Sequence, residues 1–365
     1  MKVNQNSIDQ LSVVSRKVLT ENQSQYGSYI ASPTFHEYRF AWLRDGAFCA
    51  LAAYLEGDIQ GASRFNSWVV STISRHRSIF ETAISKIEQE GTLDPKDAPP
   101  TRFQMDGSIE VDAHSVWPNY QIDGYGTWLA VALQTNLDVT NENARSIRLV
   151  ADFLCTAWSL PCFDCWEEDK DNLHGSSLLA VAGGLIAAAK LLNDEHYFEV
   201  ATEIKVRIER DFVSNGHFIK NQFSRLVDGS LAWAFLPHQA YNFDDPLVIR
   251  TIEQIKKDLQ SKNGGVKRYL GDTYYGGGDW ILLEALVSFQ ETKLGNKEAF
   301  LKSIEWIRST ANENFMLPEQ ITTNSQNKEM IQPWIDKWGL PADPLLWSHA
   351  MYLILMNEGR KQGWV

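Results

Sequence analysis

The chain has 365 residues and 44% hydrophobic content, so it can bury a large core, either as two ordinary domains or as one large closed architecture. A formal net charge of −12 and a pI near 5.2 argue against nucleic acid or an anionic membrane surface as the main partner. The N-terminus lacks the apolar core of a signal peptide and no later run reaches the roughly 18 apolar residues of a membrane helix, so we expect a cytoplasmic protein.

Two kinds of helical segment alternate along the chain. Some are apolar nearly all round, which is typical of helices buried on most sides, and they cover residues 47–57, 127–137, 177–192 and 345–359. Others, at 197–212 and 245–259, place apolar residues at helical spacing opposite a charged face. Buried helices that alternate with one-sided helices predict an inner ring wrapped by an outer ring.

The whole chain fits one such ring. It holds about eleven or twelve helix candidates, and six helical hairpins of about 60 residues each would fill its length. Convincing alternating strands are scarce, and no glycine-rich phosphate motif has the strand context of a nucleotide site. Because no composition break or Pro, Gly or Ser linker divides the sequence, we expect a single all-α toroid.

The most distinctive acidic residues are Glu167 and Glu168, which follow Trp166 in an aromatic, thiol-rich run. Apolar surroundings disfavour the charged form of a carboxyl group and raise its pKa, which suits a proton donor near neutral pH. Taken alone, the pair is more simply read as solvated helix surface. A second candidate, Glu319, follows Pro318, which breaks the preceding helix. Two such carboxyl groups are suited to face each other across a pocket.

The cysteines offer a weaker candidate site. Cys162 and Cys165 match the CxxC spacing, and His174 is a conceivable further ligand for zinc. The sequence has no second cysteine pair and no βαβ pattern, so packing in the core is the favoured interpretation. We therefore expect no metal and no cofactor.

Polar and aromatic residues gather just before the predicted inner helices. In an alternating barrel the loops that feed the inner helices open at the same end, so these residues converge on one mouth. Flat ring faces and planar hydrogen-bonding groups together suit a sugar, although each aromatic residue taken singly is compatible with core packing and Arg44 with Asp45 is compatible with a local ion pair. The residues expected at the mouth are Tyr38, Trp42, Arg44, Asp45, Trp117, Asp123, Tyr125, Trp166, Arg268, Asp272, Tyr274, Tyr275, Trp280 and Trp347.

These motifs resemble, in their order, the series found in glycoside hydrolase family 15, which contains glucoamylases, glucodextranases and trehalase-like enzymes. They are YRFAWLRDG, DGYGTW, CFDCWEE, HGSS, RYLGDTYYGGGDW and PEQ followed by DPLLWSHA, and they run from about residue 25 to 355. The resemblance implies an (α/α)6 barrel. It also implies an inverting, exo-acting hydrolase that releases β-glucose from the non-reducing ends of α-glucosides.

The resemblance further implies roles for single residues. Glu167 corresponds to the general acid and Glu319 to the general base, and an inverting pair stands roughly 6.5 to 9.5 Å apart. The remaining matched residues would hold the sugar or line its subsite: Tyr38, Arg44, Asp45, Asp123, Trp166, Glu168, Arg268, Tyr275 and Trp347.

The sequence also departs from larger members of that family. Many of them carry an N-terminal β-sandwich or a starch-binding domain, whereas this sequence begins almost at once with the predicted barrel. We therefore expect a single catalytic domain over residues 1–365. The expected substrates are small soluble α-gluco-oligosaccharides of the maltose or isomaltose type.

Three alternatives stay open from the sequence. The same residues could hydrolyse trehalose or act mainly on α-1,6 bonds, because linkage choice lies on the acceptor side of the pocket. A non-catalytic regulatory or carbohydrate-binding barrel is the second alternative, and the presence of both Glu167 and Glu319 counts against it. A phosphorylase, which uses phosphate in place of the base, is the third, and Glu319 argues for water instead.

Overall fold

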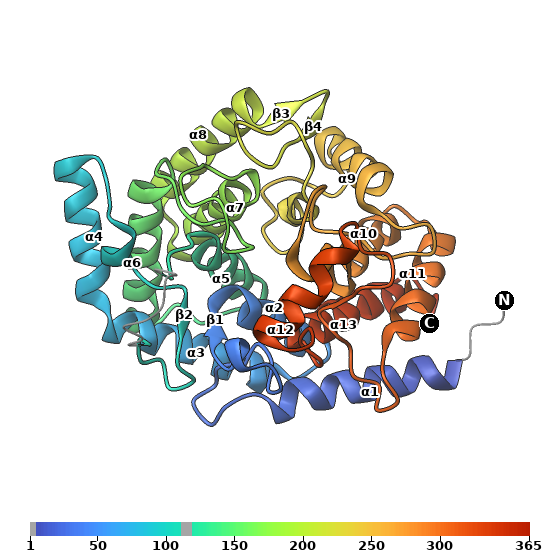
Figure 1. The fold of residues 1–365 in the computed structure, drawn as a ribbon. Helices are drawn as coiled ribbons and strands as arrows, with labels where there is room; N and C mark the ends of the chain where they lie inside the picture. The colour runs from blue at the N-terminus through green and yellow to red at the C-terminus, as the bar shows by residue number, and fades with distance from the viewer. Residues whose placement is uncertain (1–4, 111–118) are drawn as a thin grey trace.

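The computed structural model describes residues 5–110 and 119–365. Its helices form two concentric rings (Figure 1). The inner ring contains α2 (Leu43–Leu55), α5 (Asp123–Gln134), α7 (Gly175–Leu192), the 3-10 helix η3 (Gly229–Ala234), α10 (Ile281–Lys293) and α13 (Leu346–Lys361). The outer ring contains α1 (Gln5–Glu21), α3 (Ile59–Arg75), α6 (Asn141–Ala157), α8 (Glu195–Asp211), α9 (Pro246–Leu259) and α11 (Lys297–Thr310).

The inner ring is closed by contacts between neighbours. Each inner element packs against the next one along the chain, and α13 packs back on α2. The six inner and six outer elements therefore make the (α/α)6 barrel expected from the sequence.

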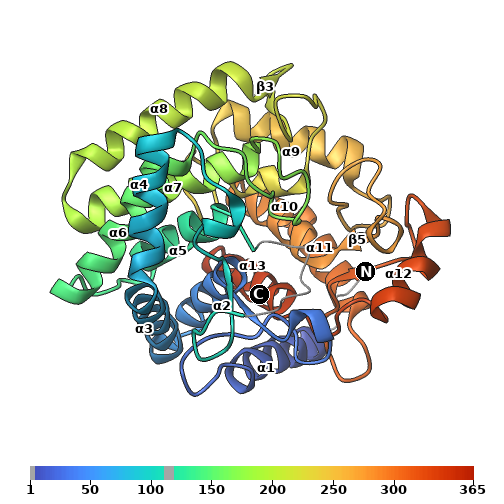
Figure 2. The ribbon, with the colours of Figure 1, turned by 60° about the vertical axis from the view of Figure 1, so that its left-hand side comes forward.

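Three elements differ from a simple set of twelve α-helices. The fourth inner position is taken by the short η3, because Pro237 follows it closely and a proline cannot continue a helix. An additional helix, α4 (Arg77–Glu90), packs outside α6, and α12 (Ile331–Trp338) lies between α11 and α13 in sequence. In Figure 2, α12 stands at the edge of the molecule, beyond the ring helices.

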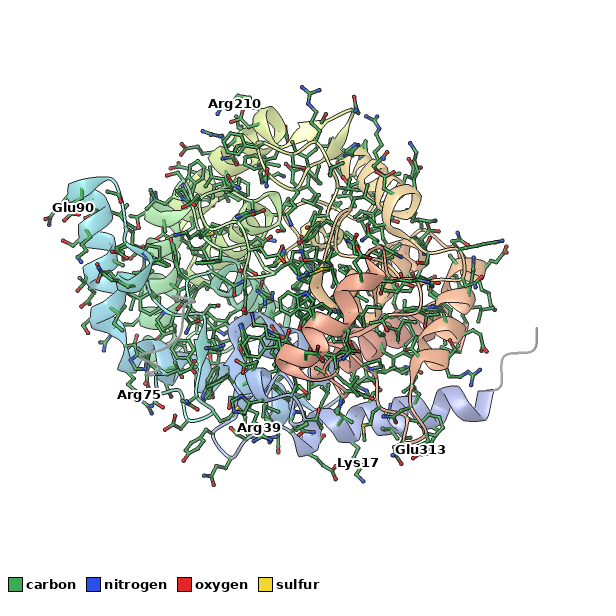
Figure 3. All side chains as sticks on the ribbon, viewed as in Figure 1. Lys17, Arg39, Arg75, Glu90, Arg210 and Glu313 are labelled. Atoms are coloured by element: carbon green, nitrogen blue, oxygen red, sulfur yellow. The ribbon has the colours of Figure 1, made fainter. Side chains whose placement is uncertain are left out.

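The outer helices are one-sided, as predicted. On α8 the buried residues Tyr197, Ala201, Ile204 and Ile208 recur at helical spacing, and the rest of the helix is largely polar. Charged side chains of the outer elements, including Arg210 on α8, point away from the ring in Figure 3.

The inner helix α7 corrects one expectation. Its 18 residues are apolar and long enough to cross a membrane by length and composition alone, although no such run was expected. In the structure 72% of that window is buried inside the protein, as a core helix of the ring. Close packing on α5 depends on glycine, because a Cβ at Gly126 would collide with the carbonyl of Ala180.

Two inner helices begin four residues earlier than the sequence predicts. α2 starts at Leu43 rather than residue 47, and α5 starts at Asp123 rather than residue 127. Arg44 and Asp45 therefore lie in the first turn of α2. A carboxylate is favoured there by the unpaired N–H groups and the helix dipole, a signal that apolar periodicity does not detect.

Short strands and 3-10 helices fix the loops at the end of the ring where the inner helices begin. Strand β1 (Ala41–Trp42) pairs with β2 (Arg102–Phe103), and β5 (Asp279–Trp280) pairs with β6 (Gln320–Ile321). The remaining short elements are β3 (Val213–Ser214), β4 (His217–Phe218), η1 (His36–Tyr38), η2 (Pro95–Asp97), η4 (Tyr274–Gly276) and η5 (Lys328–Met330).

Candidate active site

A cavity of about 590 Å³ opens where the N-terminal ends of the inner helices meet. Most of the residues predicted for the mouth line it, and they come from loops far apart in sequence. Those residues are Tyr38, Trp42, Arg44, Asp45, Trp166, Glu167, Glu168, Arg268, Tyr274, Trp280, Glu319 and Trp347.

The two adjacent glutamates are separated by the backbone of their turn. Glu167 has a φ of 66°, in the left-handed region that a non-glycine residue rarely adopts. Asp164 holds the turn, because its Oδ1 accepts the backbone N–H groups of Trp166 and Glu168, each at 2.9 Å. The side chains of Glu167 and Glu168 consequently meet different partners.

Glu167 lies against Trp42. Its Oε1 accepts a hydrogen bond from Trp42 Nε1 at 3.1 Å. Burial raises the pKa of Glu167, although the nearby cations Arg102 and Arg44 act in the opposite direction. A carboxyl group with a raised pKa is suited to donate a proton.

Glu319 lies on another wall of the cavity and is only 1% exposed. Its Oε1 accepts a hydrogen bond from Tyr38 Oη at 2.8 Å, and Tyr38 Oη also lies 2.9 Å from Tyr274 Oη. Burial raises the pKa of Glu319 to about 7, and the hydrogen bond from Tyr38 and the charge of Arg268 limit that rise. This carboxyl group therefore titrates close to neutral pH.

The backbone of Glu319 is also fixed. Its N–H donates to the carbonyl of Ala342 at 2.8 Å, and its carbonyl accepts the N–H of Ile281 at 3.4 Å. Because Ile281 is the first residue of α10, the position of Glu319 depends on the inner ring itself.

Arg44 and Asp45 form a buried charged pair at the deep end of the cavity. Arg44 Nη1 lies 2.9 Å from Asp123 Oδ2, and Arg44 Nη2 lies 3.5 Å from Asp45 Oδ2. Burial raises the pKa of Asp45 to about 6. Asp45 Oδ2 accepts no hydrogen bond, so it is free to accept one from a sugar hydroxyl.

Glu168 belongs to a second charged group. Its Oε1 lies 3.2 Å from Arg268 Nη2, and its Oε2 accepts a hydrogen bond from Tyr269 Oη. Lys220 Nζ lies 3.8 Å from the same carboxylate and 3.4 Å from each of Asp164 and Asp228. These cations hold Glu168 in place at the cavity wall.

Aromatic rings surround these charges. The guanidinium of Arg268 lies 5.2 Å from the Trp166 ring and 5.0 Å from the Tyr274 ring. Trp166 is anchored by its Nε1, which donates to Asp228 at 3.0 Å. Trp347 packs beside Arg44, whose guanidinium lies 5.3 Å from its ring.

Four of the predicted residues that the structure describes do not line the cavity. Asp272 is fully buried and pairs with Arg268, whose Nη2 lies 2.6 Å from its Oδ1. Asp123 is fully buried behind Arg44 and does not line the cavity, so it orients that arginine instead of facing a ligand. Tyr275 is also fully buried and donates to the carbonyl of Gly339 at 2.8 Å. Tyr125 packs in the core, where its Oη donates to the carbonyl of Pro100. Trp117 lies outside the described residues.

Tyr274, and not Tyr275, lines the cavity, although the family resemblance implied that Tyr275 lines the sugar subsite. The φ of Tyr275 is 47°, and this left-handed turn directs the two neighbouring tyrosines to different sides of the chain. A left-handed φ at a tyrosine has no signal in the sequence.

Several lining residues were missed by the sequence interpretation. Arg102 and Glu110 form an ion pair on the cavity wall, and Trp334 and Trp338 reach it from α12. Isolated charged residues have no recognisable pattern. The two tryptophans are four residues apart, however, and that spacing places them on one helical face.

The cysteines behave as core residues. Cys162 and Cys165 are buried and unpaired. His174 Nε2 lies 3.1 Å from the carbonyl of Cys162 and from that of Asp169. Within residues 5–110 and 119–365, no group of three or more His, Cys, Asp or Glu side chains is arranged to hold a metal ion.

A closed ring of helical hairpins with two carboxyl groups on one aromatic-lined cavity is an arrangement suited to a glycoside hydrolase. The chain belongs to glycoside hydrolase family 15, since the family model described as "Glycosyl hydrolases family 15" matches residues 9–304. This confirms the family resemblance of the sequence motifs and the assignment as a glucoamylase-like glycosidase.

Known proteins similar to this chain agree with that membership. An isomaltose glucohydrolase from Kribbella flavida is 36% identical over 355 residues, which cover 94% of this chain and 91% of the relative. A glycosidase variant solved in complex with glucose is 34% identical, with a TM-score of 0.91 and 98% of each chain covered. A bacterial glucoamylase complexed with acarbose is 18% identical and shares the fold, with a TM-score of 0.73 over 96% of this chain and 55% of its own.

Proposed function

We propose that the protein is an inverting, exo-acting α-glucosidase that releases β-glucose from the non-reducing ends of soluble isomaltose-type oligosaccharides. The observation that carries the proposal is the pair of carboxyl groups, Glu167 and Glu319, on one cavity. Different donors hold them, Trp42 on one side and Tyr38 on the other. In this proposal they act on opposite faces of the same sugar.

The reaction uses one carboxyl group as acid and the other as base. Glu167 gives its proton to the glycosidic oxygen while the bond from that oxygen to C1 breaks. Glu319 takes a proton from a water molecule, whose oxygen bonds to C1 from the opposite face. The products are β-glucose and the shortened saccharide, whose new hydroxyl group carries the proton given by Glu167.

The deep end of the cavity supports action at a chain end. Arg44 and Asp45 supply charged hydrogen-bonding groups there for the hydroxyls of a terminal glucose, and the Trp347 ring supplies an apolar face. Glu168 adds a carboxylate from the cavity wall. The rings of Phe48 and Trp233 pack behind Trp347, with centroids 4.9 and 5.3 Å away. In this proposal the wall closes the cavity behind one terminal sugar, so that the enzyme acts only at a chain end.

The linkage preference rests on the relatives. Similarity to an isomaltose glucohydrolase over nearly the full length of both chains supports α-1,6 bonds. Maltose and trehalose are the competing substrates.

Proton NMR of the first product tests the proposal. The enzyme is incubated separately with isomaltose, maltose and trehalose, and the anomeric signal of the released glucose is followed before mutarotation. We expect β-glucose, formed fastest from isomaltose. The reducing-end glucose of isomaltose and maltose is released as an α/β mixture, and inversion of trehalose frees one α-glucose. An α-glucose signal above these contributions would exclude inversion, and faster turnover of maltose or trehalose would overturn the linkage assignment.

A further inference from the structure

Helix α12 brings two tryptophans to the cavity. Trp334 and Trp338 are four residues apart on α12, so they lie on one face, and both line the cavity. The helix has no buried residue, although four of its eight residues are large and apolar. Trp338 is 38% exposed. Core packing therefore does not account for this apolar face.

The helix is tied to the residues around the base. The Trp334 ring lies edge-on to the Tyr274 ring, with centroids 5.0 Å apart. Tyr274 Oη lies 2.9 Å from Tyr38 Oη, which donates to Glu319. At the end of the helix, the Gly339 carbonyl accepts a hydrogen bond from Tyr275 Oη. These contacts hold Trp334 at a defined position relative to Glu319.

The indole N–H of Trp334 lacks a hydrogen-bond acceptor among the described residues. Trp334 Nε1 is buried and makes no hydrogen bond. An indole nitrogen can only donate, and buried donors in native proteins are nearly always satisfied. Lys337 Nζ lies 5.3 Å from the Trp334 ring and 4.8 Å from the Trp338 ring, and it adds a second donor beside the same rings.

The order of residues along the cavity decides which sugar meets this face. Buried Arg44, Asp45 and Trp347 form the deep end, and exposed Trp338 lies at the entrance. A substrate whose terminal glucose fills the deep end has its scissile bond between Glu167 and Glu319. Its next sugar, on the reducing-end side, then reaches α12.

We propose that Trp334 and Trp338 form the platform for the sugar on the reducing-end side of the scissile bond and set the preference for α-1,6-linked substrates. An α-1,6 bond contains one more rotatable bond than an α-1,4 bond, so its acceptor ring swings farther from the cleaved bond. A pair of flat rings beyond the base suits a ring in that position. This inference rests on the proposed function.

The test compares isomaltose with α-glucosyl fluoride, whose leaving group carries no sugar. Trp338→Ala should lower kcat/KM for isomaltose about tenfold and leave kcat/KM for the fluoride unchanged. Trp334→Phe keeps an aromatic ring against Tyr274 and removes the N–H donor, so its loss should also be confined to isomaltose. The matched control is Leu294→Ala, an exposed apolar residue that follows α10 at the end of the ring away from the cavity.

Each outcome has one meaning. Equal losses on both substrates would show that α12 only supports the catalytic residues, and no loss on isomaltose would remove the platform altogether. If the unmodified enzyme hydrolyses the fluoride with inversion and leaves isomaltose intact, the linkage part of the proposed function fails independently of these variants.

Discussion

In the turn at 164–169, the backbone geometry directs the adjacent side chains of Glu167 and Glu168 to different partners. The left-handed φ of Glu167 and the two N–H groups that Asp164 accepts direct Glu167 toward Trp42 and Glu168 toward Arg268. The proton donor and the sugar-binding carboxylate of our proposal can then stand next to each other in sequence without competing for one position.

The two carboxyl groups on the cavity are tested most directly by amide replacement. Glu167→Gln and Glu319→Gln should each lower kcat by about 10²–10⁴-fold, because neither amide can transfer the required proton. Circular dichroism and thermal unfolding should show an intact fold. Glu313→Gln, on the exposed surface, is the control (Figure 3). Near-normal turnover in either site variant would refute the assignment.

The hydrogen bond from Tyr38 predicts a shift in the pH profile. Glu319 must be ionised to act as base, so with its pKa near 7 the value of kcat/KM should fall as pH drops below neutrality. Tyr38→Phe removes a donor that stabilises the carboxylate, which raises the pKa of Glu319. The acidic limb of the kcat/KM profile on isomaltose should move to higher pH. An unmoved limb would mean that another group controls it.

At the level of elements, one lysine joins the loops before two inner elements. Lys220 follows β4 and its side chain is only 10% exposed. Its Nζ lies within 3.8 Å of carboxyl oxygens of Asp164 and Glu168 before α7 and of Asp228 before η3. These contacts form only when all of the loops are in place.

Removing that cation should cost both stability and substrate binding. Lys220→Met leaves three carboxylates facing one another, and breaking a buried ion pair costs about 3–5 kcal/mol in the free energy of unfolding. Since Glu168 loses one of its partners, KM should rise more than kcat falls. Urea unfolding and steady-state kinetics measure the two effects. Lys170→Met, at an exposed position in the loop that carries Glu168, should change neither.

At the level of the whole molecule, the sequence predicted the ring well and its irregular parts poorly. Continuous apolar runs such as 177–192 identify inner helices because only buried helices tolerate them. The six-residue η3 and the exposed α12, which lies outside the ring, have no such run, so neither element was predicted.

The candidate site divides in the same way. Motifs placed Glu167, Glu319 and Arg44 on one cavity, because each precedes or begins an inner helix. The sequence did not predict that Asp123 pairs with Arg44 behind the cavity wall, because that depends on a tertiary contact. It also did not predict that Tyr274 rather than Tyr275 lines the cavity, because that depends on a backbone angle.

Closure of the ring has a consequence for how activity arises. Glu167 precedes α7 in the third hairpin and Glu319 precedes α13 in the sixth, where its carbonyl is bonded to α10. In the proposed mechanism, a chain that has folded five hairpins holds the acid without the base. Hydrolysis would then begin only when the last hairpin docks, and turnover would report complete folding.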